Sequence, residues 1–294
     1  MIDRLEMFLA LAQARHFGRA AEAVGVAQPT LSAAIRGLEE SLGAVLVVRG
    51  SRYGGLTPEG ERVLVWARRM VADARAMREE MRVGREGLTG TLRLAAIPTA
   101  LAAASRLTAG FAAAHPGARV SIASATSAAI LDGIEALTID AGISYLDDAR
   151  PAWAAALPLY DERYALILRD DHPLAGRASL AWRELGDLAL GLLTPDMQNR
   201  RIIAGHLAEA GVAAAPRIES NSTIVLIAHV LAGAWATILP MGAAEVFLAH
   251  GPLRAVPLTD PDARHRVGLI VAAREPQRPL VAALIHEARR GLIG

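Results

Sequence analysis

Residues 17–43 constrain the fold of this chain more than any other segment. They are typical of two short helices joined by a tight turn, because Gly25 can adopt the positive φ that ends a helix. Pro29 fits the first turn of the next helix, where its missing N–H is not needed. The second helix then repeats apolar residues at helical spacing, at Leu31, Ile35, Leu38 and Leu42. The pattern predicts a helical pair with one buried face.

The other face of the second helix is polar and carries amide, hydroxyl and guanidinium groups. Such groups recognise base edges and phosphates when a helix enters the major groove of DNA. Residues 44–57 then predict a short strand pair, a wing, with Arg49 and Arg52 at its tip. We therefore predict a winged helix-turn-helix; a helical hairpin with a merely polar outer face is the alternative. The predicted DNA-contacting residues are Gln28, Pro29, Thr30, Ser32, Arg36, Arg49, Arg52 and Thr57.

This segment resembles the LysR-type transcriptional regulators in order and spacing, without a gap. The residues that carry the resemblance are Phe8, Phe17, Ala20-Ala21, Val26, Gln28-Pro29, Leu31-Ser32, Ile35, Leu38-Glu39, Leu42-Gly43, Leu46, Arg49, Leu56-Thr57-Pro58 and Gly60. Three positions depart from the family: Gly18 replaces a common Ser or Thr helix cap, Val47 a Phe, and Ala33 a basic residue. The resemblance implies a DNA-binding regulator that is not an enzyme and that acts as a dimer or tetramer.

Composition limits the function further. The 294 residues are enough for two domains, and they contain no cysteine, which excludes disulfides and a thiol switch and suits the cytoplasm. All basic residues are arginines. Residues 1–90 hold 13 Arg and 11 acidic residues, a balance of +2, so any DNA-binding surface must be local. The longest apolar run, 224–239, is too short to span a membrane.

Residues 61–90 predict a long linker helix and a hinge between a DNA-binding domain at 1–60 and an effector-binding domain at 91–294. Apolar residues alternate steps of four and three, as in a coiled-coil seam. The predicted dimerisation residues are Val63, Ala67, Met70, Ala74, Met77 and Met81. A homodimer would address two half-sites, which predicts an inverted-repeat operator. Packing of this stripe on the second domain is the alternative.

After Gly90, strands alternate with helices, which predicts a parallel sheet covered on both faces. Two chain crossings would divide the domain into lobes, one at 91–160 with 268–294 and the other at 161–267. The predicted fold class is therefore α/β and multi-domain. It comprises an N-terminal winged helix-turn-helix, a linker helix and a two-lobed sensor like the periplasmic binding proteins, an arrangement that the LysR family has.

Loops at helix N-termini are the predicted effector site, because free N–H groups meet there. We expect Thr99 to cap one helix, and Thr194 or Asp196 to cap another. The candidate ligand-binding residues are Pro98, Thr99, Ala100, Thr126, Ser127, Thr194, Gln198, Asn199, Arg200 and Asn221. Their chemistry favours a small organic anion. Residues 194–201 resemble regulators associated with formate dehydrogenase genes, which suggests formate or another small carboxylate. Plain helix capping is the alternative role for each hydroxyl.

Other classes of protein are less well supported. The sequence has no nucleophile elbow, phosphate loop or dinucleotide fingerprint, and its histidines lack metal-ligand spacing, so no catalytic residue, cofactor or metal is predicted. An enzyme with a spatially assembled site stays open, whereas a solute-binding module would leave residues 1–60 unexplained. The predicted partners are double-stranded DNA, a small organic acid, a second copy of the chain and RNA polymerase, with no membrane.

Overall fold

The computed structural model describes residues 1–48, 53–146, 150–213, 215–249 and 251–293. The chain forms two compact units. The first comprises Met1–Leu88 with the short segments 135–138 and 276–279, and the second comprises the remaining residues. Across the described ranges, every helix is too short or too polar to cross a bilayer.

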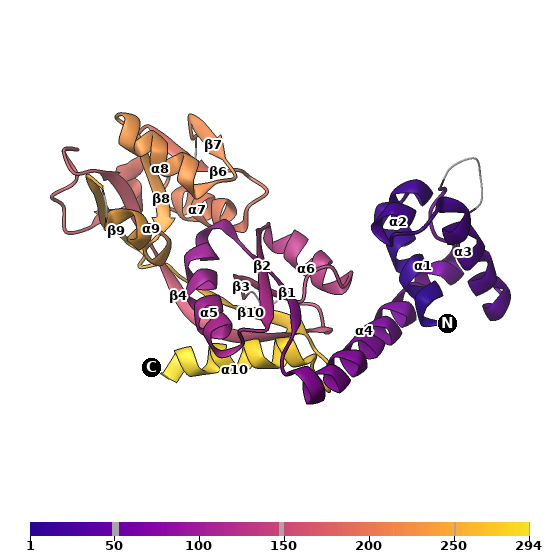
Figure 1. Cartoon of the computed structure of the whole chain (residues 1–294). Coiled ribbons are helices and arrows are strands. Elements are labelled where there is room, and N and C mark those ends of the chain that lie inside the picture. The colour runs from indigo at the N-terminus through magenta and orange to yellow at the C-terminus, as the bar shows by residue number, and fades with distance from the viewer. Residues whose placement is uncertain (49–52, 147–149, 214, 250, 294) are drawn as a thin grey trace. The chain divides into compact units, whose positions relative to one another are not determined.

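Four helices build the first unit (Figure 1): α1 Ile2–Ala14, α2 Phe17–Ala23, α3 Gln28–Leu42 and α4 Pro58–Glu86. Phe8, Leu31 and Leu38 are fully buried in its apolar core. The predicted stripe of α3 is confirmed as far as Leu38. It is wrong at Leu42, which is 44% exposed, because Gly43 adopts a left-handed conformation (φ 64°) and ends the helix there.

The described residues include the base of the predicted wing. An antiparallel bridge joins Val47 to Leu56, and the Val48 N–H donates to the Gly55 carbonyl at 3.0 Å. The tip residues Arg49 and Arg52 lie outside the described residues, so their predicted phosphate contacts stay predictions.

The predicted seam of α4 is buried near the start of the helix and exposed further along it. Ala67 is buried in the core of the first unit and Val63 packs against that core, whereas Ala74 is half-buried. Further along the helix, Met77 and Met81 are each 60% exposed. The side chain of Trp66 is also exposed. The exposed apolar stripe is therefore Trp66, Met70, Met77 and Met81.

In the part of the chain that the structure describes, the second unit contains ten strands, six α-helices and two 3₁₀ turns. The strands are β1 Gly90–Ala96, β2 Ala118–Ser124, β3 Ala141–Tyr145, β4 Ala154–Arg169, β5 Leu180–Ala181, β6 Leu190–Leu193, β7 Ile218–Ser220, β8 Ala236–Pro240, β9 Leu253–Thr259 and β10 Arg264–Ala272. The α-helices are α5 Leu101–Ala114, α6 Ser127–Glu135, α7 Gln198–Glu209, α8 Thr223–Ala232, α9 Met241–Leu248 and α10 Pro279–Ile293, and the 3₁₀ turns are η1 Pro98–Ala100 and η2 Trp182–Leu185.

The sheet runs in the order β2-β1-β3-β10-β4-β8-β6-β7, with β9 paired to β4 and β5. The predicted parallel pairing is confirmed within each half, where β1 joins β2 and β3, and β6 joins β7 and β8. The two predicted chain crossings lie in the middle of the sheet. There β10 and β4 run antiparallel to each other and to their neighbours, because these two strands carry the chain between the halves.

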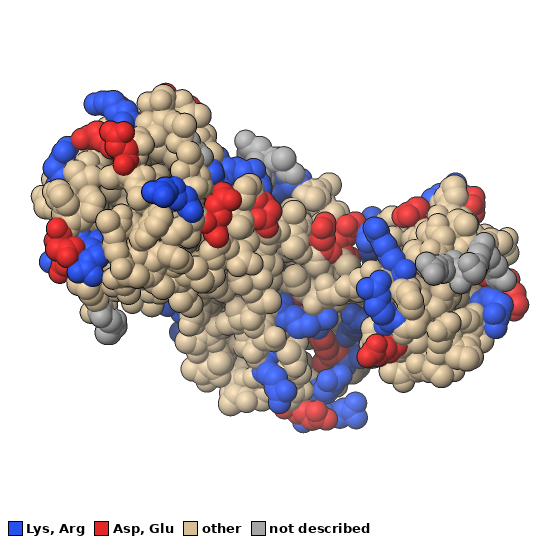
Figure 2. Space-filling view, turned by 90° about the horizontal axis from the view of Figure 1, so that it is seen from above, with Lys and Arg blue, Asp and Glu red and all other residues tan. Residues whose placement is uncertain are grey.

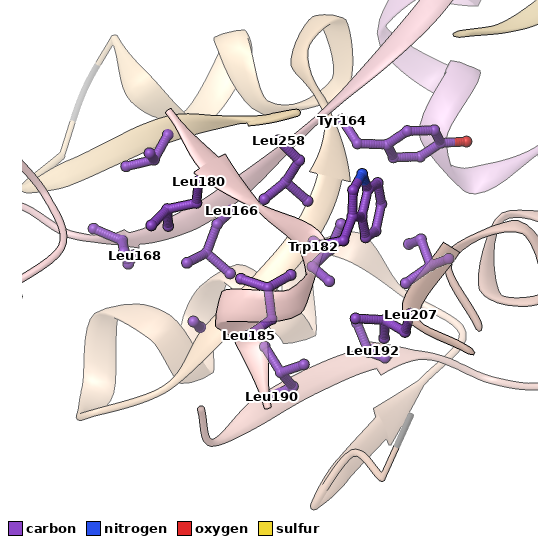
Figure 3. Packing of buried hydrophobic residues seen from close by; sticks show 14 of the residues in the cluster. Tyr164, Leu166, Leu168, Leu180, Trp182, Leu185, Leu190, Leu192, Leu207 and Leu258 are labelled. Carbon is purple, nitrogen blue, oxygen red and sulfur yellow. The ribbon is translucent and has the colours of Figure 1, made fainter. Parts of the chain in front are cut away.

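Strand β4 connects the two halves of the sheet (Figure 1). Its residues up to Arg163 pair with β10, and those from Tyr164 onward pair with β8 and β9. The second half has its own leucine-rich core, in which Trp182 and Tyr164 pack together (Figure 3). The change of partner at residues 163–164 therefore marks the junction of the halves.

Candidate nucleic-acid interface and effector site

Helix α3 separates a buried face from a polar one, as predicted. Leu31 and Ile35 are buried, whereas Gln28, Thr30 and Arg36 are exposed. Pro29 is also exposed and Ser32 is half-buried. On the face seen in Figure 2, basic and acidic side chains are interspersed among other residues. Gln28, Thr30 and Arg36 are thus accessible to solvent, and their contact with base edges stays a prediction.

An imidazole supplies the cap that Gly18 lacks. His16 is the N-cap of α2, and its Nδ1 accepts hydrogen bonds from the N–H groups of Gly18 at 3.1 Å and Arg19 at 3.3 Å. The capping function has thus moved to a neighbouring side chain, which sequence comparison at position 18 alone did not reveal.

Glu39 fixes the start of the wing and was not predicted to have this role. It is 6% exposed, and its Oε1 accepts from the N–H groups of Leu46 at 2.9 Å and Val47 at 3.3 Å. A Cβ at Gly60 would lie 2.1 Å from the Leu46 carbonyl oxygen, so only glycine permits the close approach of α4. The buried carboxylate of Glu39 and the close contact at Gly60 therefore join α3, the start of the wing and α4.

Thr57 is part of the same junction. Its hydroxyl donates to the Val45 carbonyl at 2.6 Å and accepts from the Gly60 N–H at 2.9 Å, and it is the N-cap of α4. The fold already uses both the donor and an acceptor of this group. A capping role accounts for Thr57 better than the predicted contact with DNA.

The predicted effector loops lie at the carboxyl ends of the parallel strands. Pro98, Thr99 and Ala100 are buried after β1, and Thr126 follows β2, where its hydroxyl accepts from the Ala129 N–H at 3.1 Å and caps α6. Ser127, on the same helix, is half-buried. These ends of neighbouring parallel strands share one edge of the sheet, as the sequence led us to expect.

In the other half, Thr194 follows β6 and Asn221 follows β7. Thr194 is half-buried, with no hydrogen-bond partner for its hydroxyl, and Asn221 is exposed. Two capping predictions are wrong. The N-cap residues of α5 and α7 are Ala100 and Met197, and neither helix has a side-chain cap. The chain enters both helices with apolar residues at these positions.

Four buried polar side chains, here called the Glu162 cluster, join the two halves of the sheet. They are Tyr145, Glu162, Tyr164 and Asn199. Tyr145, the last residue of β3, donates to Glu162 Oε2 at 2.6 Å and accepts from Asn199 Nδ2 at 3.1 Å. Its oxygen also lies 3.4 Å from that of Tyr164. Asn199 belongs to the first turn of α7, so the cluster links the end of β3 and the middle of β4 to the second half of the sheet.

Burial changes the acid–base chemistry of this cluster. It raises the pKa of Glu162 from 4.5 to about 7, although the hydroxyls of Tyr145, Thr99 and Tyr160 act in the opposite direction by stabilising the carboxylate. Burial and the nearby carboxyl also raise the pKa of Tyr145 well above its ordinary value. The phenols therefore stay neutral at physiological pH, and the glutamate is the member that titrates there.

A histidine pair borders the cluster. The Nε2 atoms of His206 and His265 are 3.0 Å apart, so one ring donates to the other. His265 lies directly opposite Glu162 in the β10–β4 pairing, and burial lowers its pKa. In Figure 3 the ring of Tyr164 lies beside Trp182 while its hydroxyl points away from the leucines. Tyr164 thus connects the apolar core to the polar cluster.

Of the predicted ligand residues, Asn199 belongs to the Glu162 cluster and Thr99 lies beside its carboxyl group. Gln198 is half-buried. Arg200 is buried and lies 3.9 Å from Glu219. The sequence analysis missed Glu162, Tyr145 and Tyr164. A signal was present in β4, where residues 160, 162 and 164 place an acidic group between two tyrosines on one face of a strand.

Together, these units define a winged helix-turn-helix reader followed by a two-halved α/β domain with a buried polar centre. The family description "Bacterial regulatory helix-turn-helix protein, lysR family" matches residues 2–61, and "LysR substrate binding domain" matches residues 85–292. The chain belongs to the LysR family. It is a DNA-binding transcriptional regulator with an effector-binding domain, and it is not an enzyme.

Its relatives include a "Probable hydrogen peroxide-inducible genes activator" of Streptomyces viridosporus, 33% identical over 99% of this chain and 95% of the relative. The "DNA-binding transcriptional dual regulator OxyR" of Escherichia coli K12 is 28% identical over 100% of this chain and 96% of the relative. A solved structure of full-length OxyR from Pseudomonas aeruginosa, in a variant with one cysteine replaced by aspartate, has a TM-score of 0.77 at 28% identity, covering 98% of this chain and 94% of that one.

Proposed function

We propose that this regulator responds to a small molecule by reversible binding, without thiol chemistry. Its relatives are named for a response to hydrogen peroxide, and the solved OxyR variant replaces a cysteine. This chain contains no cysteine, so neither a disulfide nor a sulfenic acid is available to it. That single feature of the sequence favours a bound ligand as the signal.

The Glu162 cluster is the proposed effector site. It lies where the carboxyl ends of both sets of parallel strands meet, which is where ligands bind in open α/β sheets. The hydroxyls of Thr99 and Ser127 favour the predicted small organic anion as the ligand. A buried carboxyl group opposes it, and none of the relatives named above is described by formate or another carboxylate.

The proposal includes a homodimer or homotetramer on an inverted-repeat promoter site. The exposed stripe of Trp66, Met70, Met77 and Met81 supports an intermolecular helix pair, because exposed apolar stripes mark contact surfaces. The same proposal comprises a division of the chain into 1–60, 61–90 and 91–294, with two lobes in the last part. It also comprises a cytoplasmic location and contact with RNA polymerase.

DNA recognition is tested by a mobility shift on the DNA upstream of the protein's own gene. We expect Gln28→Ala to relax base discrimination at one position, by about 1–3 kcal/mol, because an exposed amide would be lost from the reading helix. Arg52→Ala should weaken binding to all sequences and reduce the salt dependence. Loss of discrimination in Arg52→Ala instead would reverse these roles.

Independence from thiols is tested by footprinting with and without hydrogen peroxide. The footprint and the affinity should not change on oxidation, with a cysteine-containing relative as the positive control. A reversible peroxide-dependent change in this protein would contradict the proposal.

A further inference from the structure

Two acceptor oxygens of the Glu162 cluster are buried with no donor at hydrogen-bond distance, although the Thr99 hydroxyl lies beside the carboxyl group. Glu162 and Asn199 are each 3% exposed, and neither Glu162 Oε1 nor Asn199 Oδ1 has a hydrogen-bond partner. Buried polar atoms are nearly always paired, since leaving one unpaired is costly. Two unpaired acceptors in one cluster therefore indicate a site adapted to a hydrogen-bond donor.

One tyrosine hydroxyl holds the side chains of Glu162 and Asn199 close together. The Tyr145 oxygen bridges their side chains, at 2.6 Å from Glu162 Oε2 and 3.1 Å from Asn199 Nδ2. These bonds fix the carboxyl and the amide, and they leave the other carboxyl oxygen and the amide oxygen unpaired. The side chains come from β4 and α7, which belong to different halves of the sheet, so a ligand that bonds both would stabilise one arrangement of the halves.

The charge at the site favours a positive ligand. No arginine in the part of the chain that the structure describes pairs with Glu162, and no cation contributes to its pKa shift. An anion would meet an uncompensated carboxyl group, whereas a cation would pair with it. The ring centroids of Tyr145 and Tyr164 lie 6.4 and 5.8 Å from that of His265. Aromatic faces also attract cations.

We propose that the effector carries a protonated nitrogen, as a small amine or amidine does, and that Glu162 and Asn199 bind that nitrogen. This inference rests on the proposed function, namely that a reversible ligand acts on the second unit. It replaces the small carboxylate with a ligand of opposite charge. Two or more N–H donors on one nitrogen centre would satisfy both unpaired oxygens at once.

The groups around Glu162 determine how binding should depend on pH. Tyr145 on β3 and Tyr160 and Tyr164 on β4 have raised pKa values and stay neutral. His265 on β10, whose pKa is lowered, lies opposite Glu162 in the strand pairing and bonds to His206 on α7. Arg106 on α5 acts on Tyr160. Only the ionised carboxylate pairs with a cation, so affinity should rise with pH until the glutamate is fully ionised.

The test is a thermal-shift titration of the full chain with methylammonium and acetamidinium chloride, and with acetamide and sodium formate as uncharged and anionic probes. We expect the two cations to raise Tm in a concentration-dependent way and the other probes to leave it unchanged. Glu162→Gln should weaken cation binding by about 10- to 100-fold, and Asn199→Leu should weaken it less. In the wild type, affinity should increase by about 10-fold from pH 6 to pH 8 and should be independent of pH in Glu162→Gln.

Asp161→Asn is the matched control, because Asp161 is the adjacent residue of β4, is exposed and pairs with Arg266 at 3.2 Å. It should bind the cations as the wild type does. DNA binding by each variant without ligand shows that the protein is folded. Cation binding that is absent, or equal in Glu162→Gln, overturns the inference. Stabilisation by formate would overturn it while leaving a ligand-responsive regulator intact.

Discussion

Among the residues that the structure describes, each unit of this protein buries one glutamate, and the two differ in how their oxygens are used. Glu39 in the DNA-binding unit accepts two backbone N–H groups on one oxygen, at 2.9 and 3.3 Å. Glu162 in the effector-binding unit accepts from a tyrosine on one oxygen and leaves the other without a donor. A buried acid whose acceptors are used supports the fold, whereas one with an unused acceptor is available for a ligand.

Glu39 and Glu162 also differ in their surroundings. Glu39 lies next to the apolar core that holds Leu38 and Leu46 in place, and it fixes a rigid junction. Glu162 lies among tyrosines and histidines at the junction of the two halves of the sheet. The comparison suggests that rigidity is concentrated in the reader and chemical responsiveness in the sensor. Four substitutions test it.

Glu39→Ala should have the largest effect on stability. It would leave the buried N–H groups of Leu46 and Val47 without an acceptor, at a cost of about 3 kcal/mol. Urea denaturation followed by far-UV circular dichroism measures this change. Glu39→Gln, which keeps an acceptor oxygen, is the control and should lose less. A loss below about 0.5 kcal/mol in the alanine variant would show that Glu39 is not the anchor of the wing.

Glu162→Gln should stabilise the protein at alkaline pH. Below pH 4.5 the folded and unfolded states both hold the Glu162 proton; between pH 4.5 and about 7 only the folded state holds it, so stability falls as pH rises. The shift corresponds to about 3 kcal/mol, and the glutamine variant avoids this loss. We expect it to exceed the wild type by about 2–3 kcal/mol at pH 8 and to match it near pH 4.5. Equal stability at both pH values would contradict the raised pKa.

His16→Ala should cost the reader about 1 kcal/mol, because the N–H groups of Gly18 and Arg19 lose their cap. His16→Asn supplies another capping oxygen and should recover most of the loss. Thermal unfolding of the two variants measures the difference. A destabilisation that asparagine does not reduce would mean that the imidazole contributes through packing and not through capping.

Of the four substitutions, Thr99→Val should change stability least, but it should abolish the response to the ligand. Thr99 is 3% exposed, and valine has nearly the same shape, so stability should change by no more than about 0.5 kcal/mol. Dimerisation and DNA binding should also be unchanged. The ligand-dependent change in the footprint should disappear, since Thr99 lies beside Glu162. A footprint that still responds to ligand would place the effector elsewhere.

The sequence predicted the reader well because its information is local. Gly25, Pro29 and the apolar positions 31, 35 and 38 define two helices and their buried face within one short segment. The alternation of strands and helices predicted both parallel halves for the same reason. Strand β9 and helix α9 were missed, because their short apolar segments carry no clear helical or strand period.

By itself, the sequence determined the class of protein, the polar face of α3, the absence of thiol chemistry and the candidacy of Asn199 and Thr99. Only the tertiary structure decided that Glu39 binds the wing and that Glu162 meets Tyr145 and Asn199. Periodicity records which face of an element is buried, but not which distant element covers it. His265 and Glu162 are 103 positions apart in the chain (265 − 162), and the antiparallel pairing of β4 with β10 places them opposite each other.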